Sequence, residues 1–238
     1  MFKIKDILRV FSGALVLLVA VQFFLKKIPY FANMEEGDVS GFNFLLLYVI
    51  QILIFLIPLL LVVWLRGNIS REDFGFKKIK FKDILKFAAI GYASYFIIAM
   101  AIAQIGYSWG IEIPGFQQQE SHIPLTGERA GSAITVITII TFLGPIMEEV
   151  FFRGFLFNTM LKHWPVKLSF LLSALIFAAI HLEFRSMIPL FLIGLVLNWM
   201  FYRTKSLYPG IFFHIINNAI ALGLEYYIYL HPEVIGMV

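Results

Sequence analysis

The 238-residue chain contains no cysteine and few charged residues. Without cysteine it forms no disulfide, uses no thiolate nucleophile and offers no sulfur ligand to a metal. Only 14% of its residues are charged and 60% are hydrophobic, well above the roughly 45–50% apolar usage of soluble proteins. No basic face with interleaved aromatic residues stands outside the apolar runs, so nucleic acid is excluded as a predicted partner. The composition predicts a membrane protein whose surroundings are the lipid bilayer.

The charged residues gather in short segments that separate apolar runs of about 16 to 23 residues, the length that a helix needs to cross roughly 30 Å of hydrocarbon. These runs are too long and too uniformly apolar for the alternating strands of a barrel. We therefore expect an all-α fold, a polytopic transmembrane helical bundle of about seven spans, with eight as the alternative. The predicted spans are 10–25, 42–64, 84–105, 133–162, 167–182, 188–202 and 211–230.

We interpret residues 1–238 as a single integral membrane domain. Within it, 1–131 holds three N-terminal spans with their loops, and 132–238 holds the helices that carry the motifs described below. The first apolar run ends in Lys26-Lys27 without a small-residue cleavage site, so we expect a retained span rather than a signal peptide. The polar stretch 106–131 reads as an external loop, and a lid is the alternative.

The positive charges predict the orientation of the chain in the cell membrane. If the N-terminus is cytoplasmic, 15 of the 19 lysines and arginines fall on the inside. Basic residues are enriched in cytoplasmic loops, so we expect a multi-pass protein with its N-terminus in the cytoplasm. The basic segment 66–86 is then a cytoplasmic loop that lies against anionic headgroups.

Ionisable residues inside an apolar helix need an explanation, because a charge in hydrocarbon is costly. Glu149 and Arg153 are four residues apart and can pair along one face of a helix. Glu148 points about 100° away from that face and cannot share the contact equally. We therefore expect one neutralised carboxylate and one free carboxylate. The structural alternative is that Glu149 and Arg153 only brace neighbouring helices and take no part in chemistry.

Two later helices place polar groups at helical spacing. Phe177 and His181 share one stripe with Ser173, and His214 shares a stripe with Asn218. If the three helices converge, a cavity holds a carboxylate, two imidazoles and a carboxamide, which together can activate water and bind an oxyanion. The alternative for each histidine is a structural hydrogen bond to a neighbouring carbonyl.

These residues resemble the three ordered motifs of the CAAX protease and bacteriocin-processing (Abi) family of intramembrane glutamate endopeptidases. The motifs are Glu148-Glu149-x-x-x-Arg153, Phe177-x-x-x-His181 and His214-x-x-x-Asn218. Neighbouring residues agree with the family as well, among them Gly154, Ser173-Ala174, Gly194, Thr204, Ser206, Leu207 and Ile211. The resemblance covers roughly 144–218, whereas the first three spans are generic.

The resemblance implies hydrolysis of a peptide bond in a hydrophobic or membrane-associated peptide, in peptide maturation or in bacteriocin processing and self-immunity. By analogy, Glu148 is the general base and His181 helps to orient or deprotonate the attacking water. His214 and Asn218 stabilise the oxyanion. Glu149, Arg153 and Phe177 support the site.

Some alternatives stay open in the sequence. The family has been regarded as metal-dependent, and Glu148, His181 and His214 are acceptable zinc ligands. No His-Glu-x-x-His pair is present, so we expect no cofactor and favour metal-free activation of water over zinc. The rival class of function is a non-catalytic scaffold, receptor or small transporter whose charged cluster lines a binding cavity. Oligomeric state is not predicted.

The depth of the site is also open. Glu148 lies some 15 residues from the predicted external start of its helix, whereas His181 lies some 14 from the predicted internal start of its own. The two side chains need not share a depth at about 1.5 Å per residue. Either the long helix starts outside the hydrocarbon and tilts, or the boundaries are displaced by a turn.

Overall fold

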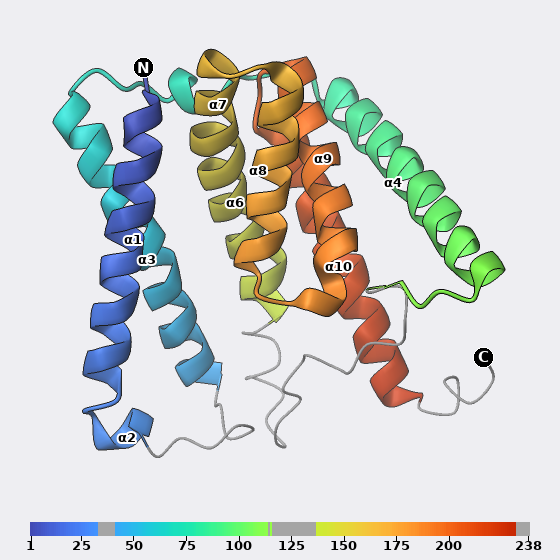
Figure 1. Ribbon diagram of the computed structural model, residues 1–238, viewed down its shortest axis with the longest axis horizontal. Helices are drawn as coiled ribbons and strands as arrows, with labels where there is room; N and C mark the ends of the chain where they lie inside the picture. The colour runs from blue at the N-terminus through green and yellow to red at the C-terminus, as the bar shows by residue number, and fades with distance from the viewer. Residues whose placement is uncertain (33–40, 114, 116–136, 232–238) are drawn as a thin grey trace. The chain divides into compact units, whose positions relative to one another are not determined.

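A computed structural model describes residues 1–32, 41–113, 115 and 137–231 of the chain (Figure 1). Over these residues the chain is helical and contains no strand, which confirms the predicted all-α class. The elements are α1 (Ile4–Leu25), α2 (Pro29–Ala32), α3 (Gly41–Arg66), the 3-10 helix η1 (Glu72–Phe74), α4 (Phe81–Trp109), the π-helix η2 (Ile139–Leu143), α6 (Gly144–Glu148), the π-helix η3 (Glu149–Phe157), α7 (Asn158–His163), α8 (Val166–Ile180), the 3-10 helix η4 (Phe184–Ser186), α9 (Met187–Thr204) and α10 (Tyr208–Leu230).

Four of the described helices are long and apolar enough to cross a membrane: Ile4–Leu25, Leu45–Arg66, Phe81–Trp109 and Met187–Thr204. Val166–Ile180 and Tyr208–Leu224 are shorter apolar helices. Each predicted span coincides with a helical stretch, and the chain is a multi-pass membrane protein. The count of seven stays a prediction. Most of the stretch 106–131 and the start of the predicted span at 133 lie outside the described residues.

The chain divides into two compact units, which we describe separately. Unit 1 comprises Met1–Ile69, Ser121–Met147 and Asn217–Val238. Its helices α1 and α3 pack against each other, and Gly13 allows close contact because a Cβ there would lie 3.0 Å from Pro58 Cβ. The fully buried Asp6 accepts hydrogen bonds from Arg66 Nε and Nη2 at 3.0 and 2.7 Å. This ion pair ties the start of α1 to the end of α3.

Unit 2 comprises Ser70–Glu120 and Glu148–Ile216. Helices α8 and α9 form its most extensive contact, which is close because Gly194 packs directly on Ala174. The buried Asn198 of α9 joins the pair by donating to the carbonyl oxygen of Phe170 at 3.1 Å and accepting from Ser173 Oγ at 3.4 Å. These contacts fix the helix that carries Phe177 and His181.

The long helix predicted over 133–162 is helical throughout its described part, but it is not a regular α-helix. Residues Ile139–Leu143 and Glu149–Phe157 are π-helical, with α6 between them and α7 after them. A π-helix bonds each carbonyl to the amide five residues on, so it turns less per residue than the roughly 100° of an α-helix. The π-helical stretches sit on both sides of Glu148, and they are frequent at functional sites.

Candidate active site

The first motif lies where α6 passes into η3. Glu149 and Arg153 are both 1% exposed, and Arg153 Nη1 donates to Glu149 Oε1 at 2.8 Å. The ion pair expected from the sequence is therefore present. Removing either partner would leave the other charge buried without compensation, which is strongly destabilising.

Glu149 has a second partner that the sequence analysis did not predict. Its Oε1 lies 3.2 Å from Nδ1 of His214 in α10, and the His214 side chain is only 6% exposed. Because a carboxylate only accepts hydrogen bonds, His214 Nδ1 carries the proton. The approach depends on Gly210, where a Cβ would lie 2.6 Å from Glu149 Oε2. Glu149 therefore fixes the orientation of His214 as well as pairing with Arg153.

Glu148 faces both histidines. Its Oε2 lies 3.7 Å from His181 Nε2 and 3.8 Å from His214 Nε2, and neither distance is a direct hydrogen bond. This oxygen is buried and has no hydrogen-bond partner in the described part of the chain. The Glu148 and His181 side chains are 29% and 28% exposed, in contrast to the buried Glu149 and Arg153. This pair is therefore more accessible than the ion pair beside it, although Glu148 Oε2 itself is buried.

His181 caps the C-terminus of α8, and its tautomer follows from its contact. Its Nδ1 lies 2.7 Å from the carbonyl oxygen of Phe177. Since a carbonyl oxygen cannot donate, Nδ1 carries the proton, and in the neutral ring Nε2 keeps its lone pair. That lone pair is on the nitrogen nearest Glu148 Oε2.

Phe177 lies at the centre of the cluster and is fully buried. The Arg153 guanidinium carbon is 4.4 Å from the centroid of the Phe177 ring, and the ring contacts both His181 and His214. Arg153 Nη2 also donates to the carbonyl oxygen of Gly194 in α9 at 3.3 Å. Arg153 and Phe177 thereby connect η3, α8, α9 and α10 within unit 2.

Asn218 belongs to unit 1, whereas the other six predicted site residues belong to unit 2. Its Nδ2 donates to the carbonyl oxygen of Ile140 at 3.0 Å. In the π-helical register the donor for that carbonyl would be the amide of residue 145, which is a proline without an N–H. Asn218 thus supplies the hydrogen bond that Pro145 cannot, and one of its two amide hydrogens is committed to it.

The residues do not fit a metal centre. Among the described histidines, aspartates and glutamates, no group of three or more is arranged to hold a metal ion. Glu148, His181 and His214, the alternative zinc ligands predicted from the sequence, do not form such a group. Activation of water without metal stays a prediction, and we derive no step through zinc.

Glu148 and His181 lie at matching positions along the two helices that meet at the turn between α7 and α8. Glu148 precedes the last residue of α7, His163, by 15 positions, and His181 follows the first residue of α8, Val166, by 15 positions. The two residues lie at similar distances from one shared turn, so their side chains meet. The depths predicted from the sequence differ because they are measured from opposite ends of the two helices.

Two of the residues that shape the site were missed in the sequence. Gly210 gives no signal, because its role is to leave room for Glu149 and it resembles any glycine at a helix start. Asn198 is a fully buried amide in an apolar helix, a signal that could have been used.

The fold and these contacts define a class, a multi-pass helical membrane protein whose apolar helices hold two glutamates, an arginine and two histidines together. Residues 130–220 match the family model described as "Type II CAAX prenyl endopeptidase Rce1-like". The matched range contains all three motifs, so the resemblance to the CAAX protease family predicted from them is confirmed.

A relative among curated proteins agrees. The Bacillus subtilis (strain 168) protein named "Putative membrane peptidase YdiL" is 21% identical over 144 residues, which cover 60% of this chain and 59% of that protein. The match thus spans less than two thirds of the length of that relative. No solved structure matches the chain significantly.

Proposed function

We propose that the chain is an intramembrane endopeptidase that hydrolyses a peptide bond with a water molecule activated by Glu148 and His181. The observation that carries the proposal is the position of Glu148 Oε2 between two imidazoles, 3.7 Å from His181 Nε2 and 3.8 Å from His214 Nε2. In the described part of the chain Glu148 Oε2 is an acceptor without a donor, and the lone pair of His181 Nε2 is a second acceptor 3.7 Å from it. A bridging water supplies the two hydrogens that they lack.

In the proposed reaction the water oxygen attacks the carbonyl carbon of the peptide bond while Glu148 takes its proton. The new C–O bond places a negative charge on the former carbonyl oxygen. When the C–N bond then breaks, the leaving nitrogen takes the proton back from Glu148. The products are a carboxylic acid and an amine, which exchange a proton to give a carboxylate and an ammonium, and Glu148 returns to its ionised form.

His214 is the proposed oxyanion donor. Because Nδ1 is engaged with Glu149, Nε2 can donate only when the ring is an imidazolium. The contact with Glu149 holds the orientation of the ring, as a carboxylate does for the histidine of a serine protease triad. Asn218 stays a predicted second donor, and it keeps one amide hydrogen that Ile140 does not use. A preorganised donor of this kind is worth about 10²–10³ in kcat.

The proposed substrate is a hydrophobic or membrane-associated peptide, because the site lies among apolar helices. Within that class we favour peptide maturation, bacteriocin processing or self-immunity. The description of the matching family names prenyl endopeptidases, and the name of the relative gives no substrate. The charge distribution supports an N-terminus in the cytoplasm.

The test compares cells that express the wild type, Glu148→Gln or Glu72→Gln. Glu72 is an exposed carboxylate in η1 and serves as the matched control. Mass spectrometry of small peptides and membrane-protein termini should find products in the wild type and the control that Glu148→Gln lacks. When a substrate found in this way is purified and assayed, Glu148→Gln should lower kcat by a factor of about 10²–10⁴. Equal turnover by Glu148→Gln would remove the base role, and no products in any of the three strains would favour the scaffold or transporter alternative.

A further inference from the structure

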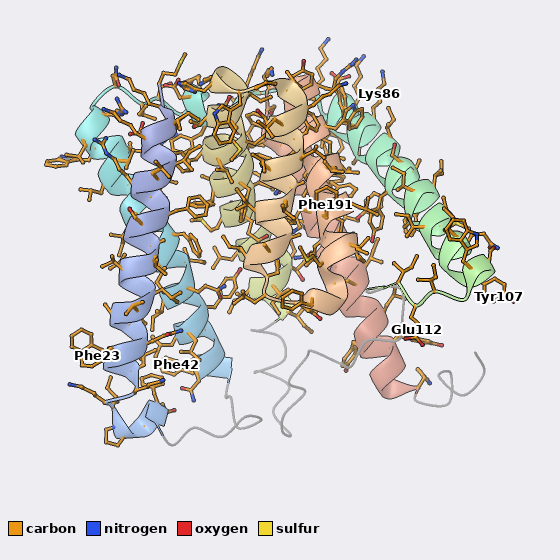
Figure 2. All side chains as sticks on the ribbon, in the orientation of Figure 1. Phe23, Phe42, Lys86, Tyr107, Glu112 and Phe191 are labelled. Atoms are coloured by element: carbon orange, nitrogen blue, oxygen red, sulfur yellow. The ribbon has the colours of Figure 1, made fainter. Side chains whose placement is uncertain are left out.

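One end of unit 2 carries a dense set of exposed lysines. The turns from α7 to α8 and from α9 to α10 and the start of α4 lie together at this end (Figure 1). Figure 2 shows Lys86 there, on the first turns of α4. Five lysines of the segment 77–86 are exposed, and none of them has an ion pair within the described ranges: Lys77, Lys78, Lys80, Lys82 and Lys86. We call these lysines, with Lys162 and Lys205, the basic face.

The segment is held in place rather than loosely attached. Ser206 Oγ donates to the carbonyl oxygen of Lys77 at 2.6 Å, and the Leu207 amide donates to that of Gly75 at 2.9 Å. Asn158 Nδ2 donates to the carbonyl oxygen of Asp73 at 2.6 Å. The backbone is thus ordered by the helices beneath it. A ligand that binds the lysines need not order the backbone first, which lowers the entropic cost of binding.

Lys205 occupies a position where glycine would be less strained. It caps α9 with a left-handed φ of 53°, a conformation that L-residues with a Cβ adopt at a cost of about 1–2 kcal/mol. Its ammonium lies 4.4 Å above the Tyr202 ring. Partial desolvation and the neighbouring Lys162 charge lower the pKa of Lys205. A lysine at this strained position, beside a like charge, indicates a role for its ammonium beyond folding.

Aromatic side chains surround these charges. Phe81 stands between Lys80 and Lys82 and is 63% exposed, and Tyr202 and Tyr208 are exposed near Lys205 in the chain. Aromatic rings and lysines at the ends of apolar helices are typical of the level where a bilayer meets water. A soluble acidic protein would meet the same charges but would not account for the exposed aromatic rings.

We propose that the basic face binds the headgroups of anionic phospholipids, with Lys205 as a direct phosphate ligand. The ligand chemistry is a phosphodiester with a net negative charge, as in phosphatidylglycerol. The zwitterionic phosphatidylcholine is the matched non-ligand. Each lysine near such a surface contributes roughly a five-fold preference for the anionic lipid.

The test uses the full-length protein in detergent, with phosphatidylglycerol or phosphatidylcholine added and retained lipid counted by native mass spectrometry. The wild type should retain phosphatidylglycerol preferentially. Lys205→Gly should bind it roughly five-fold more weakly and unfold at the same or a higher temperature, because the strain is removed. Lys205→Gln should weaken binding equally without gaining stability.

The control variant is Lys26→Gln with Lys27→Gln, two lysines of unit 1 that directly follow α1. It should keep the preference of the wild type. Equal retention of both lipids by the wild type, or an unchanged preference in Lys205→Gly, would overturn the proposal. A soluble acidic peptide can be added at the same concentration of negative charge as the lipid. If it displaces phosphatidylglycerol, the proposal is overturned in favour of a protein partner.

Discussion

Glu149 Oε1 lies 3.2 Å from His214 Nδ1, so the carboxylate that pairs with Arg153 in its own helix also holds an imidazole of α10. The adjacent Glu148 approaches the other nitrogen of the same ring at 3.8 Å. Two consecutive glutamates thus face opposite sides of one histidine. The division expected from the sequence, with Glu149 as a brace and Glu148 for the histidines, is therefore incomplete.

Glu149 should have two separable roles, in stability and in activity. Glu149→Gln leaves Arg153 as an uncompensated buried charge, so thermal unfolding in detergent should show a loss of about 3–5 kcal/mol. Combining it with Arg153→Met removes both charges and should restore most of the stability. The activity of the double variant should stay low, on the order of 10²-fold below the wild type, because His214 has lost the carboxylate that orients its ring. A double variant with full stability and full activity would show that Glu149 only braces the helix.

Asn218 and Pro145 should be energetically coupled through the carbonyl of Ile140. Asn218→Leu leaves that carbonyl without its described donor and should cost about 1–3 kcal/mol. Pro145→Ala supplies an amide five residues after Ile140, so in that background Asn218→Leu should cost less by at least about 0.5 kcal/mol. Unfolding of the four proteins of the cycle measures the coupling. The neighbouring Asn217→Leu is the control, and its loss of stability should simply add to that of Pro145→Ala. If the losses for Asn218→Leu and Pro145→Ala were also additive, the amide of residue 145 would not replace Asn218 as the donor to Ile140.

Removal of metal should leave turnover unchanged. The described residues contain no group suited to a metal ion, and Glu148 with His181 can polarise water unaided. The measurement is peptide hydrolysis by purified protein before and after prolonged dialysis against a chelator. A lasting loss that zinc alone restores would mean that a metal takes part and that the histidines serve as its ligands.

Stability should fall at low pH through Asp73, which lies outside the membrane-spanning helices. The hydrogen bond from the Ser70 amide to Asp73 Oδ2, at 2.9 Å, lowers the pKa of this carboxyl below 3.8. A carboxyl whose pKa is lower in the folded than in the unfolded state stabilises the protein at any pH above its unfolded-state pKa. That contribution is lost as the pH falls through the folded-state pKa. Unfolding measured from pH 7 downward should show this loss in the wild type, and Asp73→Asn should show a smaller one.

The fold was largely predictable from apolar run length, because backbone groups in lipid have few alternatives to a helix. The predicted run at 84–105, for example, falls within α4, which extends over Phe81–Trp109. The π-helical stretches were not predictable from hydropathy. They depend on which amide reaches which carbonyl, and only Pro145 gives a local hint that one donor is missing.

The contents of the site were predictable, but its connections were not. Glu148, Glu149 and Arg153 were identifiable as charged residues in an apolar helix, because burying a charge costs free energy and such residues usually have a partner or a function. The contact from Glu149 to His214 joins residues 65 positions apart and depends on the absence of a side chain at Gly210. Helical spacing describes neighbours on one helix and gives no information about which helix lies opposite.

The π-helix over Glu149–Phe157 holds more residues in each turn than an α-helix does, because each carbonyl bonds to the amide five residues on. Deleting one residue downstream of Arg153 would keep every motif residue and every spacing inside the first motif. The stretch would then return to α-helical register with the same number of turns, so α7 would keep its orientation relative to the glutamates. The separation between the first and second motifs can therefore change by one residue without turning the carboxylates away from the histidines.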